Sequence, residues 1–294
     1  MHRAAIEWLT ARALEAAARG DALDPLAITL LLLQYHATAR PDLGDALGGA
    51  LASALDRRAW ESGACAAEWL TLFADVAPFS EDARLQGAIE ELVGRLRGDW
   101  RRLDAIEPLT LAIGACLHAA AVIDPRDIAR DGVDELERAI GSAYRPGDGL
   151  ARSTREPDGV RGRLGDHVRA AAALLTAFSL TARLPYAMLA DELMQFARRF
   201  LWDHRGGGFF ERPDADTAAR SKPFALNCEA ARVLGRLAAL HASDEYRAAA
   251  VLAPHASYRD QAAETLDALA SEYREHGTAG AAYGVALTEW LASA

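Results

Sequence analysis

The stretch Asp24–Leu33, which reads DPLAITLLLL, decides the fold class of this chain. Asp24 is a favourable helix N-cap and Pro25 suits the first helical turn, so the pair marks the start of a helix. The residues that follow are all apolar except Thr29. A helix that is apolar on most of its sides must be surrounded by other elements, so we interpret this one as an inner helix.

Helical periodicity extends outward from this stretch over nearly the whole chain. Apolar residues recur three and four positions apart, and the alternating pattern typical of β-strands is almost absent. We predict twelve helices, at about residues 2–19, from 25 onward, 44–58, 61–77, 81–98, 105–122, 125–143, 165–182, 185–202, 228–241, 257–275 and 278–292. Twelve helices with short connections make six antiparallel hairpins. The predicted fold is therefore all-α, an α/α toroid of about six helical hairpins in a single domain spanning residues 1–294.

Capping residues and breakers refine this pattern. Ser80 is expected to cap the helix at 81–98, and Asp124 with Pro125 repeats the helix start seen at Asp24. Two segments, 144–163 and 203–222, are rich in glycine and proline or acidic residues and break the helical pattern. Long irregular loops in compact domains are often functional, although both could simply connect helical pairs.

Composition and charge exclude several functional classes. Hydrophobic residues make up 51% of the 294 residues and charged residues 25%, which is a globular balance. The formal charge of −10 argues against nucleic-acid partners and anionic membranes. No apolar run approaches the roughly 20 residues that a membrane span needs, and the first residues do not resemble a signal peptide, so we expect a cytoplasmic protein.

Cysteine spacing and rare residue types give further hints. Cys65, Cys116 and Cys228 lie far apart and form no C-x-x-C pair, so we expect neither a disulfide framework nor a zinc site, and we interpret them as small buried residues. We also expect no other metal and no bound cofactor. Lys222 is the only lysine in the chain and Asn227 the only asparagine, and they lie five positions apart. This pairing marks the surrounding segment as one where specific side chains are required.

Several motifs in the second half resemble a known family. The string Trp202–Phe210 resembles W-D-x-x-G-G-G-F-F, the segment around Asp148–Leu150 resembles a D-G-L turn, and the segment from Asn227 to Leu237 resembles N-S-x-A-A-x-x-L-x-R-L. Together with an L-x-D-x-A helix near Asp166, these motifs are similar to the helical region of thioredoxin-domain-containing proteins related to spermatogenesis-associated protein 20. The likeness covers about residues 148–291.

The resemblance implies an architecture and a site. That helical region is similar in architecture to the toroids of N-acylglucosamine 2-epimerase and cellobiose 2-epimerase. The family's thioredoxin-like domain has no counterpart here, and Phe224, Ala225 and Leu226 stand where the family has P-S-G. We place none of the epimerases' catalytic histidines on this sequence, so the catalytic residues stay unknown.

Eight side chains are candidates for binding a sugar-like ligand. Aromatic faces stack on sugar rings, and charged or amide groups hydrogen-bond hydroxyls. The candidates are Trp202, Phe209, Phe210, Arg220, Lys222, Asn227, Asp166 and His167.

Each candidate also has a purely structural interpretation. The glycines at 206–208 could end a helix while Phe209 and Phe210 pin the loop to the core. Asn227 could act as a helix N-cap beside solvated cations, and an aspartate at a helix start such as Asp166 could satisfy free backbone N–H groups.

Two functions remain open at this stage. The first is a diverged carbohydrate-active or sugar-binding toroid, which predicts that the candidate side chains converge on a pocket at the ring centre. The alternative is a non-catalytic interaction module that docks a separate protein, possibly thioredoxin-like, or a pathway enzyme. It predicts an exposed apolar patch and no pocket of perturbed pKa values.

Overall fold

A computed structural model describes residues 2–62, 65–123, 126–213, 221–250 and 256–293 of the chain. Within these ranges it contains thirteen α-helices and one two-stranded antiparallel sheet. None of the described helices combines the length and the apolar character that a bilayer crossing requires.

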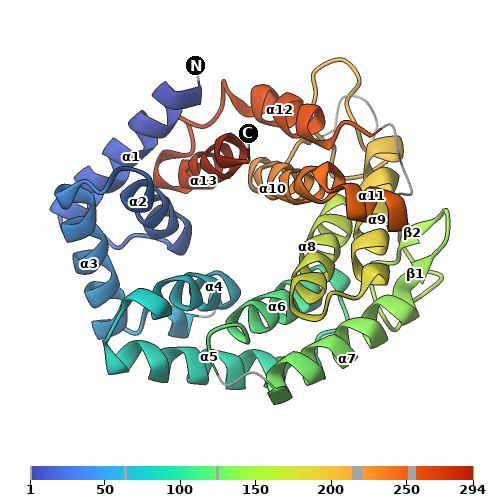
Figure 1. Ribbon diagram of the computed structural model, residues 1–294, viewed down its shortest axis with the longest axis horizontal. Helices are drawn as coiled ribbons and strands as arrows, with labels where there is room; N and C mark the ends of the chain where they lie inside the picture. The colour runs from blue at the N-terminus through green and yellow to red at the C-terminus, as the bar shows by residue number, and fades with distance from the viewer. Residues whose placement is uncertain (1, 63–64, 124–125, 214–220, 251–255, 294) are drawn as a thin grey trace.

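The helices form a ring of two layers (Figure 1). The inner layer consists of α2 (Pro25–Thr38), α4 (Ala66–Val76), α6 (Ile106–Ala119), α8 (Leu164–Thr181), α10 (Phe224–Ala242) and α13 (Ala281–Ala292). The outer layer consists of α1 (His2–Ala18), α3 (Pro41–Asp56), α5 (Ala83–Trp100), α7 (Arg126–Ala143), α9 (Leu184–Phe200) and α12 (Tyr258–Leu269). Each inner helix contacts the next, and α13 contacts both α1 and α2, so the ring closes. This confirms the predicted α/α toroid.

The inner layer is apolar where its helices meet. Ile28, Leu30 and Leu31 of α2 are fully buried, as the sequence pattern of this helix predicted. The Asp24 side chain accepts a hydrogen bond from Ala27 N–H at 2.8 Å, which confirms the predicted cap. Small residues bring α6 and α8 close together, because a Cβ on Gly114 would lie only 3.4 Å from that of Ala173.

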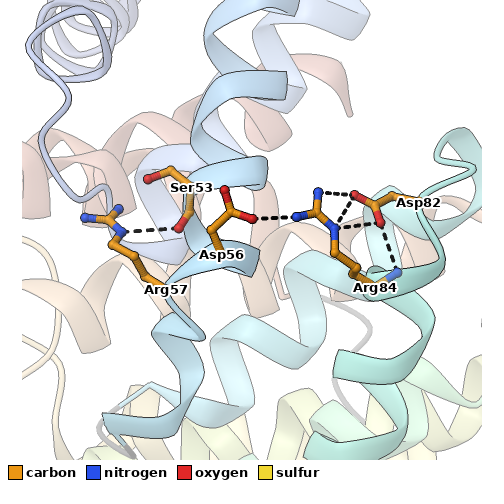
Figure 2. A network of polar contacts seen from close by, with 5 residues as sticks. All are labelled: Ser53, Asp56, Arg57, Asp82 and Arg84. Carbon is orange, nitrogen blue, oxygen red and sulfur yellow. Dashed lines mark hydrogen bonds and ion pairs between the residues drawn. The ribbon is translucent and has the colours of Figure 1, made fainter.

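Ion pairs join the outer helices at the surface. Figure 2 shows Arg84 of α5 between two carboxylates, with its guanidinium 2.5 Å from Asp56 of α3 and 2.6 Å from Asp82. On the other side of Asp56, the Arg57 guanidinium donates to the Ser53 carbonyl at 3.2 Å. Exposed pairs of this kind contribute about 0–1 kcal/mol each, so burial of the apolar stripes supplies most of the stability.

Several predicted boundaries were wrong. The N-cap of α5 is Asp82 and not Ser80, whose hydroxyl instead accepts from the Asp82 N–H. Helix α10 begins at Phe224 with Pro223 as its N-cap, so Asn227 lies inside the helix and caps nothing. The predicted start at Asp124 and Pro125 lies outside the described residues.

Short elements were missed as well. Helix α11 (Asp244–Ala250) has too few residues for a clear apolar period, and the strands β1 (Tyr144–Arg145) and β2 (Gly149–Leu150) are two residues each. The remaining short elements are the 3-10 helices η1 (Ala59–Ser62), η2 (Ala77–Phe79) and η4 (Gly277–Gly280).

Candidate functional site

The two ends of the ring differ in their connections. Because inner and outer helices alternate along the chain, the six inner helices run parallel, and all their N-termini lie at one end. The irregular segments 144–163 and 201–223 both lead into inner helices, so they lie at this end. At the opposite end α2 joins α3, and α8 joins α9, through two residues each. Long loops over a rigid scaffold are the usual place for binding residues, so this end is the candidate site.

Four charged side chains from successive inner helices meet at this end, and we call them the central cluster. They are Glu68 of α4, Glu107 of α6, Arg169 of α8 and Glu229 of α10. The Arg169 guanidinium lies 3.4 Å from the Glu107 carboxylate and 3.3 Å from that of Glu229. Glu68 and Glu229 also repel each other electrostatically, although α4 and α10 are not neighbours in the ring. Their charges therefore face each other across the ring interior.

The cluster is sheltered yet reachable by solvent. The side chains of Arg169, Glu229 and Glu107 are 22%, 25% and 37% exposed. Burial raises the pKa of Glu68, the Arg169 charge opposes that rise, and the Glu229 charge adds to it. Glu68 thus holds its proton more readily than an exposed glutamate.

Asp166 lies directly behind the cluster. Its Oδ1 accepts a hydrogen bond from the Glu107 N–H at 3.2 Å, while its buried Oδ2 has no hydrogen-bond partner in the described part of the chain. Burial and then the Glu107 charge raise the pKa of Asp166 to about 7. The Glu107 carboxylate lies against the backbone of Gly165, where a Cβ would come within 2.5 Å of its carboxyl carbon.

Polar groups continue along the ring interior beyond the cluster. Arg232 of α10 donates to both carboxylate oxygens of Glu289 on α13 at 2.7 Å. One turn further, Arg236 contacts solvent and donates to the Thr176 hydroxyl at 3.3 Å. Burial by the surrounding protein, followed by the Arg232 charge, nevertheless lowers the pKa of Arg236 to about 10. Arg232 and Arg236 therefore extend the row of charged groups along α10 beyond the central cluster.

The sequence-predicted residues of the second irregular segment contact one another. Asn227 is fully buried, its Oδ1 accepts from the Phe209 N–H at 2.7 Å, and its Nδ2 donates to the Phe209 and Pro223 carbonyls at 3.0 Å. Positive φ angles of 68° and 74° at Gly207 and Gly208 close the turn before Phe209. Asn227 therefore anchors the glycine-rich turn to helix α10.

The other predicted residues of this segment complete the anchored turn. Lys222 forms an ion pair with Asp203 at 2.6 Å and donates to the Gly207 carbonyl at 2.8 Å. The pKa of Asp203 is lowered to about 2, and the hydrogen bond from Lys222 is the main cause. The half-buried Phe210 ring lies 5.4 Å from the Lys222 ammonium. Arg220 lies outside the described residues.

The aromatic pair of this turn is buried. The Trp202 ring is 6% exposed and packs edge-to-face on Phe209 at 4.8 Å. The Arg198 guanidinium covers the Trp202 ring at 3.9 Å from its centroid, so one ring face already has a partner. These contacts match the structural interpretation of the motif, in which the aromatics hold the loop to the core.

His167 fixes the first irregular segment in the same way. Its ring is fully buried and stacks on Phe196 at 4.6 Å. Nε2 accepts from the Leu150 N–H at 3.1 Å, so the proton on Nδ1 is donated to the Arg163 carbonyl at 2.8 Å. Burial lowers the pKa of His167 to about 4, which keeps the ring neutral at physiological pH.

Those of the predicted residues that the structure describes lie at one end of the ring, but in separate groups. Trp202, Phe209, Lys222 and Asn227 contact one another, whereas Asp166 contacts Glu107 of the central cluster. Sequence reasoning missed the central cluster because single charges at helical spacing normally indicate a solvated face. One available signal was an isolated acid in the first turn of a nearly all-apolar helix, as at Glu68 and Glu107.

Solved structures show the same fold. Unsaturated glucuronyl hydrolase from Bacillus sp. GL1, described as responsible for the degradation of glycosaminoglycan, superposes with a TM-score of 0.70 at 13% identity, over 98% of this chain and 96% of that one. A variant of the enzyme of that name from Streptococcus agalactiae gives 0.73 at 11% identity, over 98% and 90%. An α-1,6-mannanase from Salegentibacter gives 0.52 at 13%, over 68% and 59%.

These likenesses establish the α/α toroid. No protein-family model matches the sequence, and no curated protein sequence is significantly similar to it.

Proposed function

We propose that this chain is a diverged carbohydrate-active or sugar-binding toroid whose ligand binds at the N-terminal end of the inner helices. The observation that carries this proposal is the central cluster, in which Arg169 joins two carboxylates while Glu68 faces one of them, Glu229, across the ring. Structural neighbours whose names denote a glucuronyl hydrolase and a mannanase support a sugar as the ligand.

The cluster also has the groups that glycoside hydrolysis requires. Such enzymes use one protonated carboxylic acid and one carboxylate on opposite sides of the scissile bond. In our proposal Glu68, whose pKa is raised, donates its proton to the glycosidic oxygen as the bond to the anomeric carbon breaks. A water molecule then bonds to the anomeric carbon and gives a proton to the Glu107 carboxylate, which lies 3.4 Å from the Arg169 guanidinium. Asp166 positions Glu107 by accepting a hydrogen bond from the Glu107 backbone N–H.

Narrower assignments rest on the sequence resemblance. We propose that the chain forms a single toroid domain, is cytoplasmic, and is related to the thioredoxin-domain-containing family and to the 2-epimerase toroids. The predicted binding residues around Trp202 and Asn227 then shape the rim of the site by holding its loops. The raised pKa values of Glu68 and Asp166 near the ring interior favour a ligand site over a purely non-catalytic docking module. A separate partner protein stays a prediction.

A panel of neutral and uronate-containing oligosaccharides tests this proposal. Binding is measured by ligand-observed NMR, and cleavage by the release of reducing ends. We expect Arg169→Gln to weaken binding of the best ligand at least about ten-fold, because it removes a charged donor, and Glu68→Gln to abolish cleavage while retaining binding.

Matched controls separate the site from the general surface. Arg12→Gln and Glu90→Gln remove exposed charges of the outer helices α1 and α5, so binding and cleavage should stay unchanged. If no sugar binds, or if Arg169→Gln binds as tightly as the wild type while remaining folded, the proposal is wrong.

A further inference from the structure

A recess on the outer wall of the ring is separate from the central cluster. It lies where the C-terminal end of α5, the middle of α7 and the loop after β2 come together, and has a volume of about 310 Å³. Trp100, Leu103, Arg101, Arg138 and Arg155 are among its lining residues. This volume is at the lower end of the range for small-molecule sites, about 300–1,000 Å³.

The recess is basic in an otherwise acidic protein. Three guanidinium groups and one carboxylate line it, while the whole chain has a formal charge of −10. The carboxylate of Glu135 pairs with Arg138 at 2.5 Å, and Arg155 lies 4.0 Å from Asp104. Arg101 forms no ion pair or side-chain hydrogen bond with any other described residue. The recess therefore has an excess of positive charge and a guanidinium available for a ligand.

A second observation points to a missing acceptor. Trp100 is 6% exposed, and its indole N–H is buried without a hydrogen-bond partner in the ranges that the structure describes. Buried polar groups normally have partners, and an unpartnered donor costs about 1–3 kcal/mol. Because this N–H is itself closed to solvent, it is an unsatisfied donor within the wall of the recess.

The walls of the recess are held in place by backbone pairing. The Ile106 N–H donates to the Arg152 carbonyl at 2.8 Å, and the Thr154 N–H donates to the Asp104 carbonyl at 2.8 Å. Ala105 and Ser153 form a β-bridge between these bonds. The loop that carries Arg155 is therefore fixed beside the end of α5, which places its guanidinium near the same space as Arg101.

We propose that this recess binds the phosphate or sulfate group of a small molecule. Guanidinium groups from three different segments line the space, so together they can donate to several oxygens of one tetrahedral oxyanion. The apolar sides of Trp100 and Leu103 contact the rest of the ligand. The site is independent of the proposed sugar-active centre.

Isothermal titration calorimetry of the whole chain with inorganic phosphate and with inorganic sulfate tests the proposal. We expect saturable binding that weakens as the salt concentration rises. The anion that binds more tightly shows whether the natural ligand carries a phosphate or a sulfate group. Arg101→Gln and Arg155→Gln should each weaken binding about ten-fold, because each removes a charge-assisted hydrogen bond.

A nearby arginine supplies the control. Arg102 is 83% exposed, does not line the recess and lies 3.8 Å from Asp99, so Arg102→Gln should bind the anion like the wild type. Absence of saturable binding of either anion overturns the proposal, as does equal weakening by Arg102→Gln and Arg101→Gln. Circular dichroism of each variant verifies that it is folded. Arg169→Gln, which changes the central cluster, should leave anion binding unchanged.

Discussion

Replacing Asn227 with alanine tests the anchoring of the glycine-rich turn in depth. The carboxamide makes three hydrogen bonds, to the Phe209 N–H at 2.7 Å and to the Phe209 and Pro223 carbonyls at 3.0 Å. The Pro223 carbonyl keeps a second donor, the Asn227 backbone N–H at 3.0 Å. Two buried polar groups of Phe209 therefore lose their described partner in Asn227→Ala.

The magnitude follows from these two groups. A buried group left unsatisfied costs about 1–3 kcal/mol, so we expect the free energy of unfolding to fall by about 3 kcal/mol. With an unfolding entropy of about 2.1 cal/mol/K per residue, this lowers the melting temperature by roughly 5 °C for a chain of this length.

Urea unfolding monitored by circular dichroism measures the change, with extrapolation to zero denaturant. The control is Gln86→Ala, which removes an exposed amide bonded only to Glu90 at 2.9 Å and should change stability by less than about 0.5 kcal/mol. A loss below about 1 kcal/mol in Asn227→Ala would refute the idea that this side chain holds the turn.

Two further predictions concern the same end of the ring. Burial and the Glu107 charge raise the pKa of Asp166 to about 7 in the folded protein. The contribution of Asp166 to folding stability is therefore complete below the pKa that this group has in the unfolded chain. It is lost as the pH rises through the folded-state pKa. The free energy of unfolding of Asp166→Asn, relative to that of the wild type, should therefore rise by up to about 4 kcal/mol between pH 4 and pH 8. Urea unfolding at each pH measures it. Gly207→Ala should destabilise by about 1–3 kcal/mol, because φ is positive there and the new Cβ would lie 2.7 Å from the Glu264 carbonyl oxygen.

Their controls are equally direct. A difference between Asp166→Asn and the wild type that does not vary with pH would show that Asp166 is ionised normally. Gly94→Ala lies at an exposed site within α5 with open space around its Cβ position, so thermal melting should show a gain of about 0.5–1 kcal/mol. A loss in Gly94→Ala as large as that in Gly207→Ala would contradict the geometric argument.

Helix positions were predictable from sequence because burial of one stripe repeats every turn. The Asp24 cap and the apolar stretch behind it identified α2 and its inner position correctly. Helix ends were harder to predict than helix positions, because Ser80 and Asp82 are both favourable N-caps for α5. Only the three-dimensional structure shows that the Asp82 side chain accepts the hydrogen bond from the Arg84 N–H.

The candidate site was harder to predict, since its residues meet through tertiary packing. Asn227 stood out correctly as an unusual residue, but its partner Phe209 lies eighteen positions away, so a local N-cap seemed sufficient. Glu68 and Arg169 look like ordinary surface charges in the sequence. Closure of the ring turns their helix faces inward, and the sequence indicates this only indirectly, through the nearly all-apolar helix that carries Glu68.

The central claim is that a sugar binds against the central cluster. A crystal structure of the protein with the tightest-binding oligosaccharide of the panel tests it most directly. We expect a sugar ring at the N-terminal end of the inner helices, with hydroxyl or carboxylate oxygens within hydrogen-bond distance of Arg169 and Glu107. An oligosaccharide bound only to the outer wall, with the cluster untouched, would contradict it.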